Sequence, residues 1–170
     1  NYVRMGAYGG GGDFVVLRAS GADDYNPYIF DLCGCDSVET FVFDKGAGTA
    51  DPFVVQTIRN AEAVFIAGGD QSNYIRYWKG TPLEDAIRFV AAKPARIGGT
   101  SAGMAILGEF SYSAMTPDSL TSATALADPY APDVTLERDF LDLPGLKGLL
   151  TDQHLQERDR MRGTVTLMAR

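Results

Sequence analysis

The stretch Gly99-Thr100-Ser101-Ala102-Gly103 decides how the rest of the chain is interpreted. It matches the pattern G-x-S-x-G and lies between a short strand-like run, residues 95–98, and an apolar run, residues 104–107. A serine in this setting is typical of a nucleophile elbow, where small neighbours permit a strained turn between strand and helix. Backbone N–H groups at the start of the helix can stabilise an oxyanion. The pattern predicts that Ser101 is a nucleophile; a glycine-rich turn without chemistry is the alternative.

Upstream of this turn, short apolar runs alternate with helical patterns. Residues 13–18, 37–43 and 63–67 have the composition of buried parallel strands. Helices are expected to begin at Asn26-Pro27 and Asp51-Pro52, because proline is favoured in the first turn after a capping residue. The alternation predicts an α/β fold, a three-layer sandwich with helices on both faces of a central, mostly parallel sheet.

A third helix is expected after Thr81-Pro82-Leu83-Glu84, which has the pattern of a capping box with proline at the first helical position. Apolar residues then recur at the spacing of one helix face. These residues are Leu83, Ala86, Ile87 and Val90.

A serine nucleophile needs a base, and His154 is the single histidine of the chain. It follows an apolar run, residues 148–150, so it is expected beyond the carboxyl end of a strand. A carboxylate should orient the imidazole ring. Six acidic residues between Ser101 and His154 are candidates, and Asp118 is the nearest after the strand-like run 109–112. The other five are Asp128, Asp133, Glu137, Asp139 and Asp142.

Two further groups of polar residues attract attention. Gly68-Gly69-Asp70-Gln71 follows the third strand, and its glycines would let the backbone approach a ligand closely. Arg158, Arg160 and Arg162 follow His154, and their guanidinium groups could bind a substrate carboxylate. An ordinary strand-to-helix turn and a solvated charged helix face are the alternatives.

Composition excludes several classes of function. Fifteen basic residues against twenty-two acidic ones give a net charge of −7, which argues against nucleic acid or an anionic membrane as a partner. No apolar stretch approaches the roughly 20 residues of a membrane span. One histidine excludes a multi-histidine metal centre, and no metal or cofactor is expected. Two cysteines, Cys33 and Cys35, do not make a disulfide framework.

Three motifs together resemble the cyanophycinases and α-aspartyl dipeptidases, serine peptidases of the S51 family. They are residues 65–71 (FIAGGDQ), residues 97–103 (IGGTSAG), and residues 151–154 (TDQH) followed by residues 158–161 (RDRM). The resemblance extends from about Asp13 to Met161 and favours the cyanophycinase branch, because of Gly-Gly-Asp-Gln and Asp-Gln-His.

This resemblance implies a class I glutamine amidotransferase-like (flavodoxin-like) fold and an exopeptidase that cuts cyanophycin to β-Asp-Arg dipeptides. Ser101 would be the nucleophile, His154 the base and Asp118 the triad acid. Backbone groups of Gly69, Asp70 and Ala102 would form the oxyanion hole. Substrate recognition would fall to Gln71, Asp152, Gln153, Arg158 and Arg160. The family also implies a possible homodimer, and a chain longer at both ends than this single domain of residues 1–170.

Alternatives remain open. The family's Gly-Arg-Leu after Arg-Asp-Arg-Met is replaced by Arg162-Gly163-Thr164, which favours a non-catalytic binding protein or degraded paralogue. An α-aspartyl dipeptidase is a further possibility. A cysteine amidotransferase is rejected because Ser101 occupies the position of its cysteine. An α/β-hydrolase is rejected because its HGGG-type loop needs a second histidine. A Rossmann dinucleotide site is rejected because no clean G-x-G-x-x-G occurs. The opening residues show no signal-peptide pattern, so a cytoplasmic location is expected.

Overall fold

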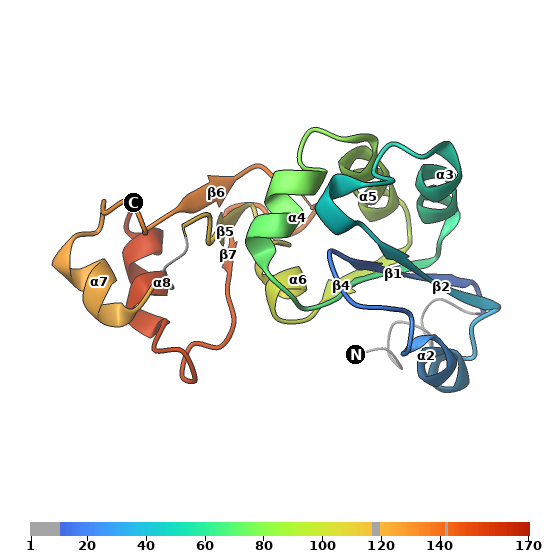
Figure 1. Cartoon of the computed structure of the whole chain (residues 1–170), viewed down its shortest axis with the longest axis horizontal. Coiled ribbons are helices and arrows are strands. Elements are labelled where there is room, and N and C mark those ends of the chain that lie inside the picture. Colours follow the sequence, from blue (N-terminus) through green and yellow to red (C-terminus); the bar gives the residue numbers. More distant parts are fainter. Residues whose placement is uncertain (1–10, 117–119, 142) are drawn as a thin grey trace.

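A computed structural model describes residues 11–116, 120–141 and 143–170. Four strands form the main sheet, which is parallel throughout and has the order β2-β1-β3-β4 (Figure 1). They are β1 (Asp13–Arg18), β2 (Ser37–Val42), β3 (Ala63–Ile66) and β4 (Arg96–Gly99). The strands predicted from the apolar runs are therefore confirmed to within a residue at each end.

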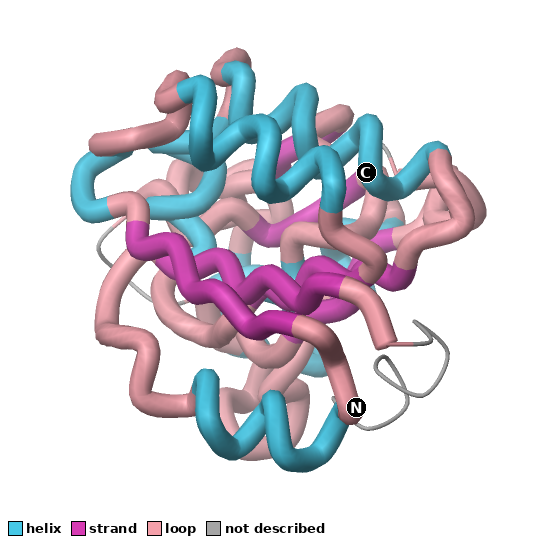
Figure 2. Tube along the Cα trace, turned by 90° about the vertical axis from the view of Figure 1, so that its right-hand side faces the viewer, coloured by secondary structure: helices cyan, strands magenta, loops and turns pink. Residues whose placement is uncertain are grey.

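Helices cover both faces of this sheet, as Figure 2 shows. On one face lies α2 (Asn26–Cys33); on the other lie α3 (Pro52–Asn60), α4 (Gln71–Trp78) and α5 (Pro82–Ala92). Alternation along β1 separates the two layers, because successive side chains of a strand point to opposite faces. Phe14 and Val16 pack in the core beneath α2, whereas Val15 and Leu17 belong to the larger core with α3 and α5. The predicted three-layer α/β architecture is thus the one observed.

The helix starts follow from local chemistry, with one correction. Asp51 accepts hydrogen bonds from the N–H groups of Phe53 and Val54, so it caps α3 as expected. Thr81 occupies the N-cap of α5 but makes no side-chain capping bond. The capping box predicted there is wrong, because the Glu84 carboxylate instead accepts from the N–H of Gly80 and pairs with Arg88. The expected apolar face of α5 is fully buried.

A second, smaller sheet has the order β6-β5-β7. It consists of β5 (Phe110–Tyr112), β6 (Leu136–Arg138) and β7 (Leu150–Thr151). The strand predicted over residues 148–150 is observed one to two residues later, as β7, and it runs parallel to β5 rather than joining the main sheet. The helices α7 (Ser122–Ala127) and α8 (Met161–Met168) pack beside this sheet at the left of Figure 1. The short helix α6 (Ala102–Ala105) connects the two sheets.

The remaining features of the fold are a disulfide, a short 3-10 helix and the character of the helices. A disulfide joins Cys33 and Cys35 at the C-terminal end of α2, where both cysteines are buried in the smaller core. The 3-10 helix η1 (Asp44–Gly46) lies in the connection between β2 and α3. Within the described residues, no helix has both the length and the apolar character needed to cross a membrane.

Candidate active site

Ser101 occupies a tight turn between β4 and α6 in a backbone conformation that few side chains adopt. Its φ and ψ angles are 49° and −123°. Two glycines of the motif are sterically required. A Cβ atom on Gly99 would overlap the carbonyl group of Gly103, and one on Gly103 would overlap the carbonyl oxygen of Ile66. The spacing in G-x-S-x-G thus reflects how closely this turn packs against β3, and it holds the serine in a strained conformation.

The hydroxyl of Ser101 contacts the imidazole ring of His154. The distance from Ser101 Oγ to His154 Nε2 is 2.8 Å, which is within hydrogen-bond reach. His154 lies in the loop after β7, with a left-handed φ of 58°, and is partly exposed. The two residues come from different sheets, so the pair exists only because α6 and β7 pack together. This is the contact required between a serine nucleophile and its base.

Gln153, the residue before His154, contacts the turn that contains Ser101. Gln153 Oε1 accepts a hydrogen bond of 2.6 Å from the backbone N–H of Ser101. The elbow turn is also tied to β3, because the N–H of Thr100 donates to the carbonyl of Ile66. Sequence reasoning expects Gln153 at the substrate; in this structure its amide oxygen fixes the position of Ser101 relative to the histidine loop.

Behind this loop lies a buried ion pair between Asp152 and Arg160. Arg160 Nη1 lies 3.6 Å from Asp152 Oδ1, and both side chains are more than nine-tenths buried. The other carboxylate oxygen of Asp152 accepts from the hydroxyl of Thr164, and the Arg160 guanidinium lies over the ring of Tyr112. Burial raises the pKa of the Tyr112 hydroxyl. Asp152 and Arg160 therefore connect the histidine loop to α8 and β5.

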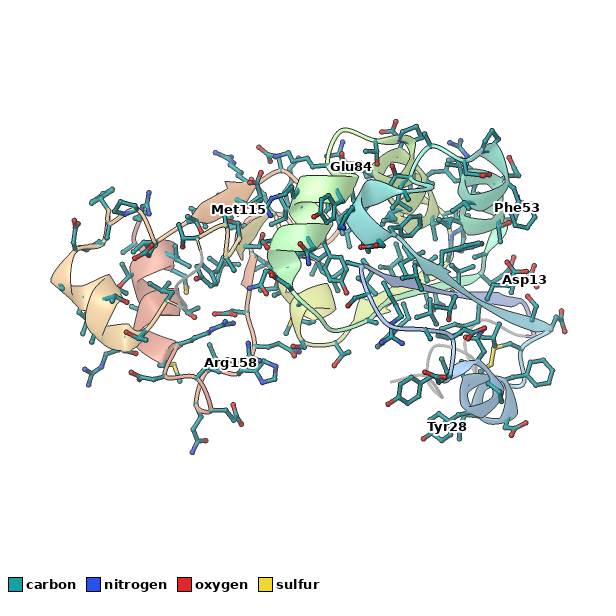
Figure 3. The ribbon with its side chains drawn as sticks, viewed as in Figure 1. Asp13, Tyr28, Phe53, Glu84, Met115 and Arg158 are labelled. Carbon is teal, nitrogen blue, oxygen red and sulfur yellow. A yellow bond between two sulfur atoms is a disulfide. The ribbon has the colours of Figure 1, made fainter. Side chains whose placement is uncertain are left out.

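Arg158 and Arg162 differ from Arg160, because both side chains are exposed. Figure 3 labels Arg158, which lies on the loop of the histidine. The N–H of Arg158 donates to the carbonyl of His154 and closes the turn there. Of the three arginines, these two are available to a ligand in solution.

The Gly68-Gly69 segment lies beside Ser101. A Cβ atom built on Gly68 would stand 3.3 Å from Ser101 Cβ. The hydroxyl of Tyr74 donates to the carbonyl oxygens of Ala67 and Gly68 at 2.8 and 3.1 Å, which orients this segment. Burial raises the pKa of Tyr74 to about 12.

The backbone N–H groups predicted to form the oxyanion hole have no acceptor among the described residues and can donate to a ligand. Among the described residues, no acceptor bonds the backbone N–H of Gly69, Asp70 or Ala102. The Asp70 side chain caps α4 by accepting from Ser72 N–H. Gln71 is buried, and its amide donates to the carbonyl of Tyr112.

Three of the six candidate acids between Ser101 and His154 contact other groups. Glu137 pairs with Lys79, Asp139 with Arg138, and Asp128 accepts from the N–H of Tyr130. Within the described residues, no carboxylate is hydrogen-bonded to His154. Asp118 and Asp142 lie outside the described residues. The described part of the chain also contains no group of three or more His, Cys, Asp or Glu side chains placed to hold a metal ion.

Fold and site together define an α/β protein with a serine–histidine pair at a tight strand-to-helix turn. The sequence model of peptidase family S51 matches residues 33–129, more than half of the chain and including Ser101. The chain belongs to peptidase family S51. The membership of family S51 expected from the three motifs is thereby confirmed.

A comparison of structures supports the fold. The crystal structure of a peptidase from an acI-B1 Actinobacterium matches with a TM-score of 0.55 and 16% sequence identity. The match covers 72% of this chain and 52% of that peptidase, so the chain spans about half of its length. No curated protein matches the sequence.

Three residues with evident roles in the site are missed or misjudged by sequence reasoning. In the sequence, Tyr74 looks like an ordinary apolar residue of an amphipathic helix. Thr164 looks like an ordinary polar residue next to a run of charged residues. The contact between Gln153 and Ser101 joins residues 52 positions apart. The one available signal for the latter is that Gln153 immediately precedes the single histidine.

Proposed function

We propose that this chain is a serine-type peptidase that hydrolyses aspartyl peptide bonds, with cyanophycin as substrate and β-Asp-Arg dipeptides as products. The observation that carries the proposal is the 2.8 Å contact between Ser101 Oγ and His154 Nε2 on a strained elbow. Membership of family S51 supports the peptidase class. The cyanophycin substrate rests on the motifs around Asp70 and His154, and an α-aspartyl dipeptidase is the close alternative.

The proposed mechanism follows from the geometry. Ser101 Oγ attacks the scissile carbonyl carbon while His154 Nε2 takes the hydroxyl proton. The N–H groups of Gly69, Asp70 and Ala102 stabilise the oxyanion that forms. The C–N bond then breaks, the imidazolium gives its proton to the leaving nitrogen, and an acyl ester remains on Ser101. Water, deprotonated by His154, attacks this ester and releases the acid product and the free serine.

We assign the orientation of the imidazole to Asp118. Glu137, Asp139 and Asp128 are engaged with other groups, which leaves Asp118, Asp133 and Asp142, and Asp118 is the nearest of these after β5. An aligned carboxylate is worth about 10⁴ in rate in such triads. Asp118→Asn should therefore reduce kcat strongly, whereas the matched change Asp128→Asn should leave it unchanged. Equal activity of the two variants would remove Asp118 from the mechanism.

A non-catalytic binding protein is the second candidate. The observation in its favour is that no carboxylate among the described residues bonds His154. It predicts a protein that binds aspartyl peptides without cutting them. The single-domain organisation and the homodimer expected from the family remain predictions under either candidate.

The deciding experiment is hydrolysis of cyanophycin and of Asp-Xaa dipeptides by the wild type, Ser101→Ala and His154→Ala. The proposal expects cleavage by the wild type and losses of about 10⁴-fold or more in both variants. Preference for the polymer or the dipeptides separates the cyanophycinase from the α-aspartyl dipeptidase. A folded wild type that cuts neither substrate contradicts the peptidase and favours the binding protein.

A further inference from the structure

A cavity of about 400 Å³ lies at the carboxyl ends of the main-sheet strands, beside the elbow. That volume is within the range of small-molecule sites, and this edge of a parallel sheet is where such sites form. Two of its lining residues, Gly68 and Thr100, are the immediate neighbours of the nucleophile. The position of a Cβ atom on Gly68 lies 3.9 Å from Ser101 Oγ. The cavity is therefore close enough to hold a part of the molecule whose carbonyl is attacked.

Strand alternation brings one charged side chain into this cavity. Phe14, Val16 and Arg18 share the face of β1 that is covered by α2. The first two are buried, and Arg18 follows them at the point where the strand ends and the cavity begins. Thr40 lies opposite Val16 on β2 and lines the cavity as well.

The Arg18 guanidinium is fixed by the loop that follows its own strand. Nε donates to the carbonyl of Ser20 at 3.0 Å, and Nη1 donates to the carbonyl of Ala22 at 2.7 Å. Gly21 has a φ of 93°, and a Cβ atom there would overlap Nη2. These bonds leave further N–H groups of the guanidinium without an acceptor among the described residues. A cation held in place loses little freedom when it binds an anion.

The chemistry of the lining favours an anion. Arg18 is accompanied by the side chains of Tyr25 and Thr40, whose hydroxyl donates to Asn26 Oδ1, and no Asp or Glu is among the described residues that line the cavity. We propose that this cavity is a substrate subsite in which Arg18 binds a carboxylate of the peptide. The carboxylate is either the C-terminal one or that of an acidic side chain. The subsite rests on the proposed function, since it supplies the specificity of that reaction.

Binding to Ser101→Ala tests the subsite without turnover. Calorimetry would compare Asp-Leu with its C-terminal amide and with Asn-Leu, in the Ser101→Ala protein with and without Arg18→Met. A charge-assisted hydrogen bond lost corresponds to a change of about ten- to hundredfold in Kd. We expect the free peptide to bind that much more tightly than one of these two analogues, the one that lacks the carboxylate held by Arg18, and Arg18→Met to abolish the difference. The weaker of these two analogues identifies which carboxylate is bound.

A matched control and a second variant protect the test. Arg59→Met makes the same change on α3, at the opposite edge of the sheet, and should leave all affinities unchanged. Thr40→Glu places a carboxylate in the cavity without touching the loop contacts of Arg18. It should weaken binding of the free peptide and spare the analogue that lacks the carboxylate bound by Arg18. Thermal melts establish that each variant is folded.

The outcomes separate the subsite from the proposed function. Equal affinities for all peptides, no binding of any, or a difference that survives Arg18→Met and Thr40→Glu would overturn the subsite. Hydrolysis by the protein with Ser101 intact is measured separately. Arg18-dependent binding without any cleavage would overturn the peptidase and leave the subsite standing. Cleavage with no dependence on Arg18 would do the reverse.

Discussion

Gly103 packs so closely on Ile66 that a Cβ atom on the glycine would overlap the carbonyl oxygen of the isoleucine. This contact joins the first turn of α6 to β3 and fixes the direction in which the elbow leaves the sheet. The spacing between Ser101 and the second glycine of the motif is therefore a packing requirement. It explains why the pentapeptide is informative about structure as well as about chemistry.

Gly103→Ala should destabilise the fold and displace Ser101 from His154. Overpacking a close contact costs about 1–3 kcal/mol, and the displaced hydroxyl should lower kcat at least tenfold. Urea denaturation and peptide hydrolysis measure the two effects. Gly148→Ala is the control: it has a φ of 73° but open space around it, so only the conformational cost of about 1 kcal/mol should appear. Similar behaviour of the two variants would mean that the contact with Ile66 does not matter.

Gln153→Leu should lower kcat more than it raises KM. The substitution removes the acceptor of the Ser101 N–H while keeping the side chain's bulk, so the serine is less firmly held. Small displacements at such centres cost about 10²-fold in rate. The steady-state parameters of Gln153→Leu are compared with those of Gln156→Leu, whose side chain is exposed. A rise in KM at unchanged kcat would instead assign Gln153 to substrate binding alone.

Sequence patterns predict the main sheet well because its strands carry their own signal. Buried parallel strands read as continuous apolar runs, and Asp51 and Pro52 mark a helix start locally. Ser101 and His154 are found for a similar reason: one lies in a sterically dictated motif, and the other is the single histidine of the chain.

The second sheet and the supporting contacts could not be predicted in this way. Strand β7 has two residues, too few for a period, and its pairing with β5 depends on the path of the whole chain. Glu84 does not cap its own helix, because one oxygen of its carboxylate accepts from Gly80 N–H while the other pairs with Arg88. The pairing of Asp152 with Arg160 spans eight residues of irregular loop, where no periodicity constrains the distance.

Tyr74→Phe should loosen the segment beside the nucleophile and flatten the alkaline limb of the stability profile. The lost hydroxyl bonds to Ala67 and Gly68 cost about 1 kcal/mol of unfolding free energy near neutral pH. Because the folded-state pKa of Tyr74 is about 12 and the ordinary value is 10.0, the folded protein retains a proton that the unfolded chain releases. Wild-type stability should therefore fall as the pH rises from 10 to 12, and Tyr74→Phe should remove that part of the fall.

Chemical denaturation at pH 8, 10 and 11 would measure this dependence. Tyr28→Phe, whose side chain is exposed, is the matched control and should follow the wild type at each pH. An identical slope above pH 10 in Tyr74→Phe and the wild type would show that this hydroxyl does not govern the alkaline limb.

Glu109→Gln tests the hydrogen bond that holds the loop before β7, the strand that leads into the loop of His154. The N–H of Gly148 donates to the Glu109 carboxylate at 2.6 Å, and the Arg138 guanidinium lies 3.1 Å from it. Both contacts lower the pKa of the Glu109 carboxyl from its ordinary 4.5, and the hydrogen bond from Gly148 has the larger effect. A depressed folded-state pKa stabilises the protein above the unfolded value, and this stability is lost as the pH falls through the folded value. The wild type should therefore lose more stability than Glu109→Gln on acidification from pH 6 to 3, as measured by thermal melts. Glu157→Gln, at an exposed position, is the control and should lose as much stability on acidification as the wild type. If Glu109→Gln also loses as much stability as the wild type, the Gly148 bond does not stabilise the ionised form of Glu109.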